Sequence, residues 1–423
     1  MAVETTAGVM ARERGWRASS WFLLASLTIV NTVNWADRQV VPILFPSIKQ
    51  ELALTDTELG IIGGLSFSII YAVSAFVFGF MADRGSRRLI ILFGLVSWSL
   101  ATAAGGLATG FWTLFAARFF TGIGEASLYP CAMSLMTDRF DVVGRGKAVG
   151  MFGAAAAVGG GLGIGLGGRL AEIMGWREVF FLYGGIGLLL VPLVLLLEEP
   201  ARPDHAPEAE VSSARTILDA LTDTRLLAVW GTGTIMMAAA IGWVAWVPMY
   251  FVRDLGFDMT QTGLLFGAAQ LVGGVIGSII GGRLGDVYRA RRMAGQLDVS
   301  ALAALISAPL LMVPLLDVPN PVLITASILG PMAIFAYFPN LQTAVAEIVP
   351  PRRLGLTFAV HVLFLGGLGS SVGPYIVGSL SDFTGDLRTA LFAPIIGMLI
   401  AAPGAALAGR VIRRSAHDRK SAR

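Results

Sequence analysis

The sequence predicts an all-α integral membrane protein whose twelve transmembrane helices form two six-helix pseudo-repeats. Three observations predict this fold class. Only 14% of the 423 residues are charged and 55% are hydrophobic, whereas a soluble domain carries roughly 25% charged residues. Apolar runs long enough to cross a bilayer recur along the chain. Part of the second half also repeats the first at a constant offset.

The first predicted span is the apolar run over 20–44, which follows a polar N-terminal arm over 1–19. This run is too long for the core of a signal peptide, and no small-residue cleavage site ends it. We therefore expect it to stay in the protein as a membrane helix. The other eleven predicted spans are 57–81, 88–109, 111–137, 146–171, 178–197, 226–251, 260–282, 295–316, 321–346, 354–380 and 389–411.

The longest polar stretch, 198–224, divides these spans six and six. Its composition is typical of a linker, with a short surface helix expected over 212–222. The predicted domains are therefore an N-terminal bundle over 20–197 and a C-terminal bundle over 225–411. A polar cytoplasmic tail over 412–423 follows the second bundle.

Lysine and arginine set the expected orientation, because they gather in cytoplasmic loops. With the N-terminus inside, most of them fall on the inner side. The outer side holds only Lys49, Arg177, Arg253 and Arg388, with Arg169 close to it. We therefore expect both termini in the cytoplasm of a multi-pass plasma-membrane protein, which in a bacterium is the inner membrane.

The two halves repeat one another around the second span of each. A shift of 203 residues superposes six residue types. Near the fifth spans, three further matches occur at a slightly longer offset. Two six-helix halves in parallel repeat are an architecture of transporters, with the substrate site between the halves at mid-membrane. The matched pairs are Thr57 and Thr260, Gly60 and Gly263, Gly64 and Gly267, Gly79 and Gly282, Asp83 and Asp286, Arg88 and Arg291, Gly168 and Gly378, Glu172 and Asp382, and Gly175 and Gly385.

A charged loop joins the second and third spans of each half. It reads GFMADRGSRR over 79–88 and GRLGDVYRARR over 282–292. A carboxylate at the membrane edge can cap a neighbouring helix N-terminus or pair with an adjacent arginine, and so lock one arrangement of the halves. We expect these loops to be gates, with Gly79, Asp83, Arg84, Arg87 and Arg88 in the first and Asp286, Arg291 and Arg292 in the second.

This loop resembles the signature loop of the major facilitator superfamily, and with the spans and the repeat the resemblance covers essentially the whole chain. A narrower resemblance is to the spinster-like branch. It rests on the sequences NWADR over 34–38, RFFTGIGEAS over 118–127 and VPPRR over 349–353. Members of that branch include proton-linked carriers of lysophospholipids and of sphingosine-1-phosphate, so the resemblance implies a carrier of that kind.

Four ionisable residues lie within apolar spans, namely Asp37, Arg38, Arg118 and Glu125. A charge at bilayer depth costs at least about 2.5–3.5 kcal/mol on insertion scales, so such residues indicate function. Counting the rise per residue from opposite entry sides places Arg38 and Arg118 at similar depth and Glu125 near the middle. If spans one and four face each other, Asp37 can pair with Arg118, which leaves Arg38 to face Glu125 or an anion.

These residues suggest a coupling mechanism. Burial favours the neutral form of a carboxyl group, and a nearby arginine favours the charged form. A substrate anion that takes over the arginine would let Glu125 bind a proton, with Asp37 as helper. The forked guanidinium of Arg38 suits phosphate or carboxylate. The alternative is a static bridge that ties helices together. Arg118, Asn34 and Tyr129 share these polar faces and are the other expected substrate contacts of this half.

The second half has no clearly buried carboxylate or arginine in its spans. Its candidate substrate contacts are nearly neutral: Trp243, Tyr337, Asn340 and His361. His361 could titrate near neutral pH, although a lone histidine in a packed helix is more often structural. A charged face opposite an aromatic and apolar one suits an amphiphile or an aromatic acid better than a sugar.

Other motifs exclude several classes of protein. Gly163, Gly165 and Gly168 match a dinucleotide fingerprint, but no strand precedes them. No phosphate-binding Gly-x-x-x-x-Gly-Lys is present, so ATP is not expected to drive the cycle. The single cysteine, Cys131, excludes an internal disulfide and a multi-cysteine metal site. We therefore expect no enzyme activity, no cofactor and no metal, and a net charge of only +3 gives no reason to expect nucleic acid.

The expected function is secondary transport by alternating access, in a chain able to act as a monomer among membrane lipids. The expected substrates are protons and an amphipathic anion such as a lysophospholipid. The alternative carrier is a proton symporter of a small organic acid, such as an aromatic or sugar acid. From another class, the alternatives are an uncoupled lipid scramblase or a non-transporting sensor.

Overall fold

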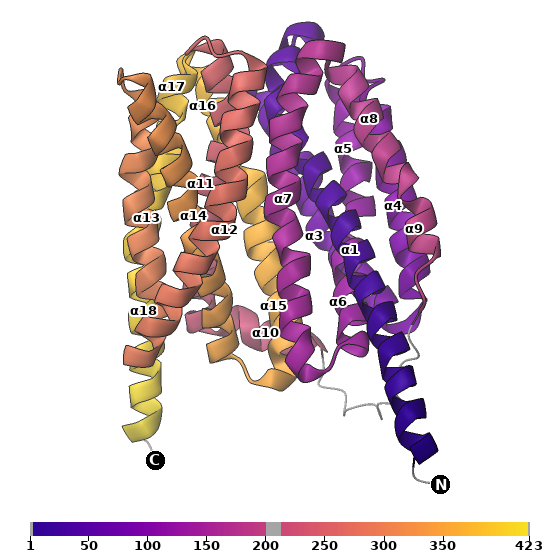
Figure 1. Ribbon diagram of the computed structural model, residues 1–423. Coiled ribbons are helices and arrows are strands. Elements are labelled where there is room, and N and C mark those ends of the chain that lie inside the picture. The colour runs from indigo at the N-terminus through magenta and orange to yellow at the C-terminus, as the bar shows by residue number, and fades with distance from the viewer. Residues whose placement is uncertain (1–2, 200–212, 422–423) are drawn as a thin grey trace.

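The computed structural model describes residues 3–199 and 213–421. It consists of two helical bundles that stand side by side, with the N-terminal half in indigo to magenta and the C-terminal half in orange to yellow (Figure 1). The first helix begins and the last helix ends on the same side of the molecule. We call this the inner side and the opposite one the outer side, following the charge bias of the sequence.

The N-terminal bundle contains nine helical segments and one π-helical turn. The predicted spans agree with these segments within a few residues, except that the first helix begins at Val3 and ends at Leu52, eight residues past the predicted end of its span. The segments are α1 (Val3–Leu52), α2 (Asp56–Gly60), the π-helical turn Ile61–Leu65, α3 (Ser66–Arg84), α4 (Arg87–Gly105), α5 (Phe111–Glu125), α6 (Leu128–Arg139), α7 (Val142–Met174), α8 (Trp176–Leu189) and α9 (Val191–Leu195).

The C-terminal bundle follows a linker whose residues 200–212 lie outside the described residues. The expected surface helix is present as α10, and α12 extends nine residues past the predicted end of its span. The segments are α10 (Ser213–Thr222), α11 (Thr224–Arg253), α12 (Met259–Arg291), α13 (Gln296–Met312), a 3-10 turn Val313–Leu315, α14 (Asn320–Ile348), α15 (Pro351–Val362), the π-helical turn Leu363–Gly369, α16 (Ser370–Thr384), α17 (Leu387–Ala390) and α18 (Phe392–Ser421).

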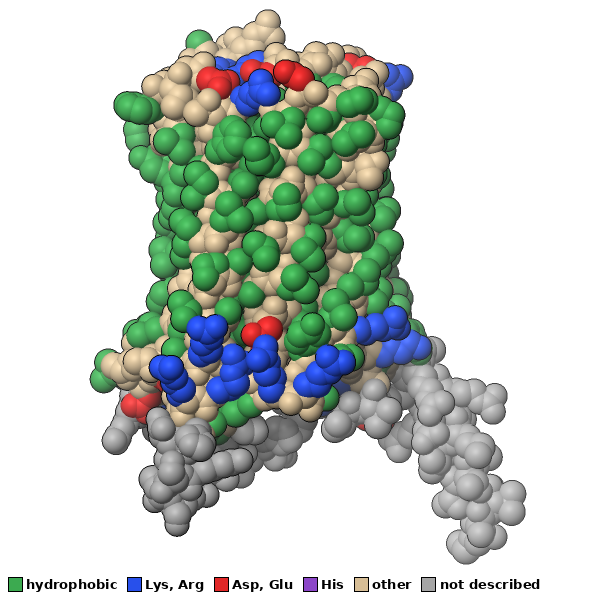
Figure 2. All heavy atoms as spheres, turned by 90° about the vertical axis from the view of Figure 1, so that its left-hand side faces the viewer, with side chains coloured by type: hydrophobic (Ala, Val, Ile, Leu, Met, Phe, Trp, Pro, Cys, Tyr) green, Lys and Arg blue, Asp and Glu red, His purple; other side chains and the backbone are tan. Residues whose placement is uncertain are grey.

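Ten helices within the described ranges are long and apolar enough to cross a membrane. The other two predicted spans are α1, which carries Asp37 and Arg38, and the pair α5 and α6, which a turn interrupts just after Glu125. Apolar side chains cover the lateral face of the molecule between two charged rims (Figure 2). The two spans with the weakest apolar signal are thus the ones that carry the buried charges.

Aspartate side chains mark the beginning of several long helices. Asp141, Asp223 and Asp258 each accept a hydrogen bond from a backbone N–H in the first turn of α7, α11 and α12. Such caps satisfy donors that have no partner inside the helix. They define where a span begins more sharply than hydropathy does.

Contacts between the halves lie in the outer part of the spans. The α7–α12 packing runs from the pair Ala157 and Gly274 to the pair Glu172 and Thr260. The packing of α2 and α3 against α16 and its preceding turn runs from the Asp56–Asp382 contact to Ala72 beside Gly367. Among the side chains that the structure describes, no hydrogen bond or ion pair joins the two bundles on the inner side. The described polar contacts between the halves thus lie at their outer ends.

Two glycines of the sequence repeat permit this packing. A Cβ added to Gly168 would lie 2.1 Å from the carbonyl oxygen of Met259, and one added to Gly378 would lie 2.2 Å from that of Asp56. Both distances are far below any real contact of a Cβ atom, so a side chain at either position would push the halves apart. The two sites are equivalent under the repeat, which explains why glycine occurs at both.

Candidate functional site

An ion pair between the first and fourth spans forms the centre of the candidate site. Arg38 donates from Nε (3.1 Å) and Nη2 (2.8 Å) to Oε2 of Glu125. The Glu125 side chain is fully buried, whereas 19% of the Arg38 side chain is exposed. The sequence predicted that Arg38 faces either Glu125 or an anion, and the structure places Arg38 and Glu125 in contact. Oε1 of Glu125 is buried without a hydrogen-bond partner.

Three aromatic rings surround the Arg38 guanidinium. Its Cζ lies 4.7 Å from the ring centroid of Trp35, 4.7 Å from that of Phe67 and 4.4 Å from that of Tyr71. Each ring face attracts a cation, by about 0.5–2 kcal/mol depending on solvent exposure. This aromatic cage holds the arginine in the membrane interior. Sequence reasoning missed it, although the i, i+4 spacing of Phe67 and Tyr71 places both on one helix face.

Asp37 and Arg118 do not form the ion pair that the sequence suggested. Asp37 instead accepts a hydrogen bond of 2.5 Å at Oδ2 from the hydroxyl of Thr102 on α4, and its Oδ1 has no partner. Among the residues that the structure describes, Arg118 forms no ion pair, and its Cζ lies 4.8 Å from the Phe67 ring centroid. The expectation was wrong because Thr102, on a third helix, provides the partner of Asp37.

The site therefore contains buried polar atoms without partners. Besides the free oxygens of Asp37 and Glu125, these are Nε and Nη1 of Arg118 and Nδ2 of Asn34. Most buried polar groups in native proteins are hydrogen-bonded, and an unpaired one requires an explanation. Donors and acceptors of this kind are ready to bind water, a proton or a polar ligand.

Tyr129 lies at the periphery of this cluster. Its side chain is 53% exposed, and its ring centroid is 6.0 Å from that of Phe152. The structure records no hydrogen bond from Tyr129 to the four charged residues. A role in binding substrate stays a prediction for this residue.

Three of the four candidates of the C-terminal half, Asn340, His361 and Tyr337, are buried within their own bundle. Asn340 donates from Nδ2 to the carbonyl oxygens of Gly281 (3.1 Å) and Ala336 (2.9 Å), so its amide links α14 to α12. His361 packs against Phe358, with 5.6 Å between ring centroids. Tyr337 is 1% exposed. Within the described ranges, no hydrogen bond, ion pair or ring contact joins any of these three to Arg38 or Glu125.

Trp243 is the fourth candidate and differs from the others. It lines a small cavity between α7, α11 and α12, together with Ile164 of the N-terminal half and Gln270. The indole Nε1 of Trp243 is buried and has no hydrogen-bond partner. Trp243 is thus the candidate of this half that lies beside the interface between the bundles. Its neighbour Trp246 donates to the carbonyl oxygen of Pro374 (2.8 Å).

The first charged loop is held by a carboxylate that sequence reasoning assigned to the linker. Glu199 accepts hydrogen bonds from the backbone N–H groups of Arg87 (2.9 Å) and Arg88 (3.1 Å) at the start of α4, and from the hydroxyl of Ser86 (2.5 Å). The Arg87 guanidinium is buried between Glu199 and Asp138. Glu199 therefore provides the helix cap that the loop pattern suggested for a carboxylate.

The remaining residues of the two loops lie at the inner rim. Gly79 faces Pro130 of α6, Asp83 is exposed, and the Arg84 guanidinium lies 3.6 Å from the Phe80 ring centroid. In the second loop, Asp286 is exposed. Arg291 lies over Tyr288, and Arg292 pairs with Asp298 at 2.8 Å. Each described contact stays within one half, so a gating role for these loops stays a prediction.

We expect the stability of the inner rim to depend on pH through Glu199. Burial opposes its charge, but the hydrogen bonds from Ser86, Arg87 and Arg88 prevail and lower the pKa of Glu199 from 4.5 to about 2. The stabilisation is therefore complete above pH 4.5 and is lost as the pH falls through about 2. Glu199→Gln should lower the melting temperature at pH 7, and this deficit should shrink below pH 4.5.

The adjacent Glu198 offers a matched control, because its side chain is 78% exposed and meets Arg139 at 3.5 Å. Glu198→Gln should change the melting temperature much less than Glu199→Gln. Equal melting temperatures for the two variants across the whole pH range would show that the Glu199 cap contributes nothing.

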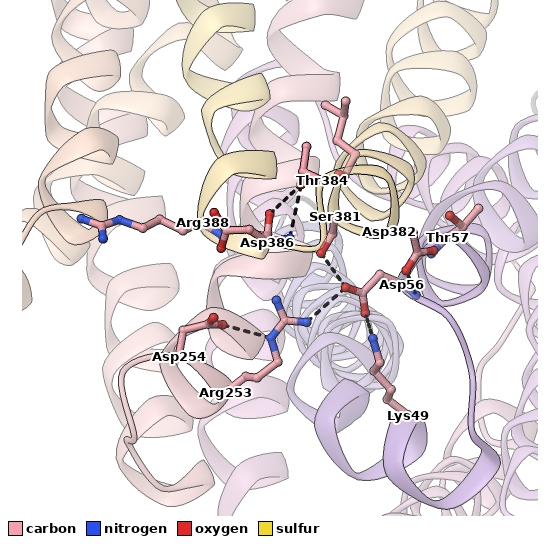
Figure 3. A network of polar contacts seen from close by, with 11 residues as sticks. Lys49, Asp56, Thr57, Arg253, Asp254, Ser381, Asp382, Thr384, Asp386 and Arg388 are labelled. Atoms are coloured by element: carbon pink, nitrogen blue, oxygen red, sulfur yellow. Dashed lines mark hydrogen bonds and ion pairs between the residues drawn. The ribbon is translucent and has the colours of Figure 1, made fainter.

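The outer ends of the two bundles are joined by a polar network that sequence reasoning did not foresee (Figure 3). Asp56 at the start of α2 is 2% exposed and binds Lys49 of its own half. From the other half, Arg253 donates from Nη1 (3.1 Å) and Ser381 from its hydroxyl (2.6 Å). We call this network, with the carboxylates of Asp382 and Glu172 described next, the outer clasp.

Two further carboxylates of the outer clasp, Glu172 and Asp382, occupy equivalent positions in the sequence repeat. Asp382, at the end of α16, accepts from the backbone N–H groups of Asp56 (3.0 Å) and Thr57 (2.7 Å). Glu172, at the end of α7, accepts from the backbone N–H of Thr260 (3.1 Å) and from the Thr260 hydroxyl. Each half therefore caps the start of the other half's second span. Four of the residues matched by the repeat therefore meet across the interface, Thr57 with Asp382 and Thr260 with Glu172.

Comparison with known proteins agrees with this architecture. The family model described as Major Facilitator Superfamily matches residues 27–374. An "MFS-type efflux pump" of Mycolicibacterium smegmatis is 28% identical over 392 residues, which cover 90% of each chain. "Protein spinster homolog 1" of Homo sapiens is 27% identical over 95% of this chain and 82% of that protein. "Sphingosine-1-phosphate transporter SPNS2" of Xenopus tropicalis is 25% identical over 90% of this chain and 77% of that protein.

Among solved structures, a bacterial homologue of the human lysosomal transporter Spinster, inward-facing and unoccupied, has a TM-score of 0.83 and 22% identity. The match covers 93% of this chain and 97% of that one. The occupied inward-facing form of a bacterial Spinster homologue has a TM-score of 0.80.

Proposed function

Because this chain belongs to the Major Facilitator Superfamily, with spinster proteins among its homologues, we propose that it is a proton-coupled secondary carrier of an amphipathic anion. That the chain is a multi-pass membrane transporter rather than an enzyme follows from the family. The proton coupling and the anionic substrate rest on a single observation, the buried pair of Arg38 and Glu125 with unpaired polar atoms around it.

The geometry supports an exchange of partners at Arg38. Nε and Nη2 of Arg38 both contact one oxygen of Glu125, and a cation in this position favours the charged form of the carboxyl group. A phosphate or carboxylate group on the substrate competes for the same guanidinium, for which it offers a bidentate fit. Glu125, left without its counter-charge in a fully buried position, then binds a proton. Substrate and proton are thus loaded together.

The outer clasp supports alternating access as the transport cycle. The bundles are joined through Asp56, Asp382 and Glu172 at their outer ends. A closed outer side is what an inward-facing carrier requires, and the solved Spinster homologues of the same fold are inward-facing. The change from the inward-open to the outward-open conformation requires that the outer clasp opens.

The proposed cargo is an anion with an apolar tail. The charged cluster belongs to the N-terminal half, while Trp243, Tyr337 and their neighbours in the other half are apolar or neutral. One homologue is named as a transporter of sphingosine-1-phosphate, which has a phosphate headgroup and an alkyl chain. In this proposal the anionic headgroup pairs with Arg38 of the N-terminal half, and the alkyl chain lies against the apolar residues of the C-terminal half.

A ligand screen by thermal shift tests this proposal. Wild type and Arg38→Ala should be compared with lysophosphatidylglycerol, sphingosine-1-phosphate, benzoate and gluconate. We expect at least one of the two lipids to raise the melting temperature of the wild type and to have little effect on Arg38→Ala. A lipid that stabilises both proteins equally would contradict the anchor role of Arg38.

The same screen separates the alternatives. A response to benzoate or gluconate and none to either lipid would favour a symporter of small organic acids. Lipid movement in liposomes that needs no proton gradient would indicate a scramblase. Binding without any transport would indicate a sensor.

A further inference from the structure

A belt of arginines lies on the inner rim of the C-terminal half. Figure 2 shows basic side chains gathered directly below the apolar lateral face, with few acidic ones among them. The belt is formed by the inner ends of α12 and α18 and the residue that follows α12. Its members, which we call the basic belt, are Arg283, Arg289, Arg291, Arg292, Arg410, Arg413 and Arg414.

Few carboxylates offset this charge. Asp298 lies between the two helices, 2.8 Å from Arg292 Nη2 and 3.5 Å from Arg413 Nη1. Its Oδ2, which makes both contacts, nevertheless has no partner with hydrogen-bond geometry. Asp298 therefore forms ion pairs with both arginines without a well-aligned hydrogen bond, while Arg413 Nη1 also donates to the carbonyl oxygen of Met293 (3.4 Å). Glu347 meets Arg289 only at 3.8 Å, and Asp286 is exposed.

The other members of the basic belt have no acidic partner among the described side chains. Among the residues that the structure describes, no carboxylate lies within ion-pair distance of Arg283, Arg291, Arg410 or Arg414, and all four are exposed. Arg410 and Arg414 are separated by four residues on α18, so they project from the same face. Two like charges so placed repel each other unless an anion lies between them.

The inner rim of the N-terminal half is different. Six of its described basic residues are almost matched by five described acidic ones, and Arg87 and Arg139 form ion pairs with three of these. The general preference of basic residues for the cytoplasmic side accounts for both rims but not for this difference. The residues compared are Arg84, Arg87, Arg88, Arg139, Arg145 and Lys147 with Asp83, Asp138, Asp141, Glu198 and Glu199.

Apolar side chains accompany the basic belt on the same helices. Leu284 is 41% exposed and Val287 47% exposed on α12, and Leu407 is 54% exposed on α18. A molecule that lies on this surface thus meets arginines at the membrane edge and apolar groups toward the bilayer core. This combination matches a phospholipid whose headgroup is anionic, because basic clusters between helices at the cytoplasmic face bind such headgroups.

We propose that the basic belt is a binding site for an anionic phospholipid of the cytoplasmic leaflet. The phosphates bind between α12 and α18 at Arg410 and Arg414, which have no acidic partner among the described side chains, and the acyl chains lie along Leu284 and Leu407. A bound lipid of this kind joins the last helix of the chain to the charged loop after α12.

Lipid binding to the purified full-length protein tests this proposal. Native mass spectrometry should compare cardiolipin, phosphatidylglycerol and phosphatidylcholine as added lipids. We expect cardiolipin to bind more tightly than phosphatidylcholine. In Arg410→Gln/Arg414→Gln the affinity for cardiolipin should fall about tenfold or more, since each arginine near an anionic lipid surface contributes about 1 kcal/mol to binding. Neither residue belongs to the candidate substrate site or to the gating loops.

The control variant is Arg145→Gln/Lys147→Gln, which removes two charges from the inner rim of the N-terminal half. It should bind cardiolipin as the wild type does. The inference is overturned if both variants bind cardiolipin equally, if phosphatidylcholine binds as tightly, or if inorganic phosphate at millimolar concentration gives the same melting temperature as cardiolipin. The last result would assign the belt to a soluble anion.

Discussion

Glu125→Gln is expected to abolish proton-driven accumulation of substrate while leaving exchange of substrate across the membrane. Glutamine keeps the size of the side chain and can still accept a hydrogen bond from Arg38, but it cannot gain or lose a proton. The pair would then carry no counter-charge for the arginine, so the site would bind an anion without a linked proton. The rate of substrate uptake should no longer depend on an imposed pH gradient.

The measurement is uptake of labelled substrate into proteoliposomes with and without a pH gradient, beside counterflow at equal pH on both sides. Glu178→Gln is a matched control, because Glu178 is an exposed glutamate near the outer side. It should show wild-type uptake. Full gradient-driven uptake by Glu125→Gln would exclude this residue as the proton carrier, and loss of counterflow as well would indicate a structural role.

The second large effect is expected at the outer clasp. Asp382→Asn replaces a carboxylate that accepts from two backbone N–H groups of the other half by an amide with a single oxygen acceptor. A hydrogen bond to a charged group contributes about 1.5–3 kcal/mol. Loss of one such bond should therefore shift the ratio of outward-open to inward-open molecules by roughly tenfold or more. Combination with Glu172→Gln should add to this shift, because Glu172 makes the equivalent contact at the other side of the interface.

Distances between spin labels across the outer face measure this ratio. Leu107 and Leu316 suit the labels, since they are 68% and 42% exposed on the two halves, in a chain whose Cys131 is replaced by alanine. We expect a new population at longer distance in Asp382→Asn. Asp254→Asn is the control, because Asp254 pairs with Arg253 inside one half. An unchanged distance distribution in the double variant of Asp382 and Glu172 would show that the clasp does not hold the outer side closed.

Much of the architecture could be predicted because hydropathy and charge bias report on the membrane itself. The apolar runs matched the helices within a few residues at most ends, and the helix order followed. The exceptions are helix ends that extend beyond the apolar run into water, where hydropathy no longer marks the end of the helix. For example, α12 continues to Arg291, past the apolar run, because a charged helix end is stable in water.

Contact of Arg38 with Glu125 was one of two expected outcomes, the other being an anion, because counting the rise per residue placed both side chains inside the membrane. The partner of Asp37 could not be predicted in this way. Depth does not give the rotation of each helix or the identity of the third helix beside it, and Thr102 on α4 was therefore overlooked. The aromatic cage around Arg38 was missed for the same reason.

The candidate residues of the C-terminal half show a second limit. A buried amide needs partners, and in Asn340 they are backbone carbonyls of an adjacent helix rather than a ligand. A single polar residue in an apolar span gives no sign of which of these it contacts. The repeat did reveal Thr57, Thr260, Glu172 and Asp382 as equivalent positions. It could not reveal that they meet, since a common offset says nothing about which helices pack across the halves.

Proton uptake on ligand binding tests the central claim most directly. Lysophosphatidylglycerol is a suitable probe, because its phosphodiester does not titrate near neutral pH. Its addition to the purified protein in weakly buffered detergent solution at pH 7 should remove about one proton from the medium per ligand bound, as Glu125 exchanges Arg38 for a proton. Glu125→Gln should bind the lipid without this uptake. Binding to the wild type with no change in free protons, or equal uptake by both proteins, would contradict the account.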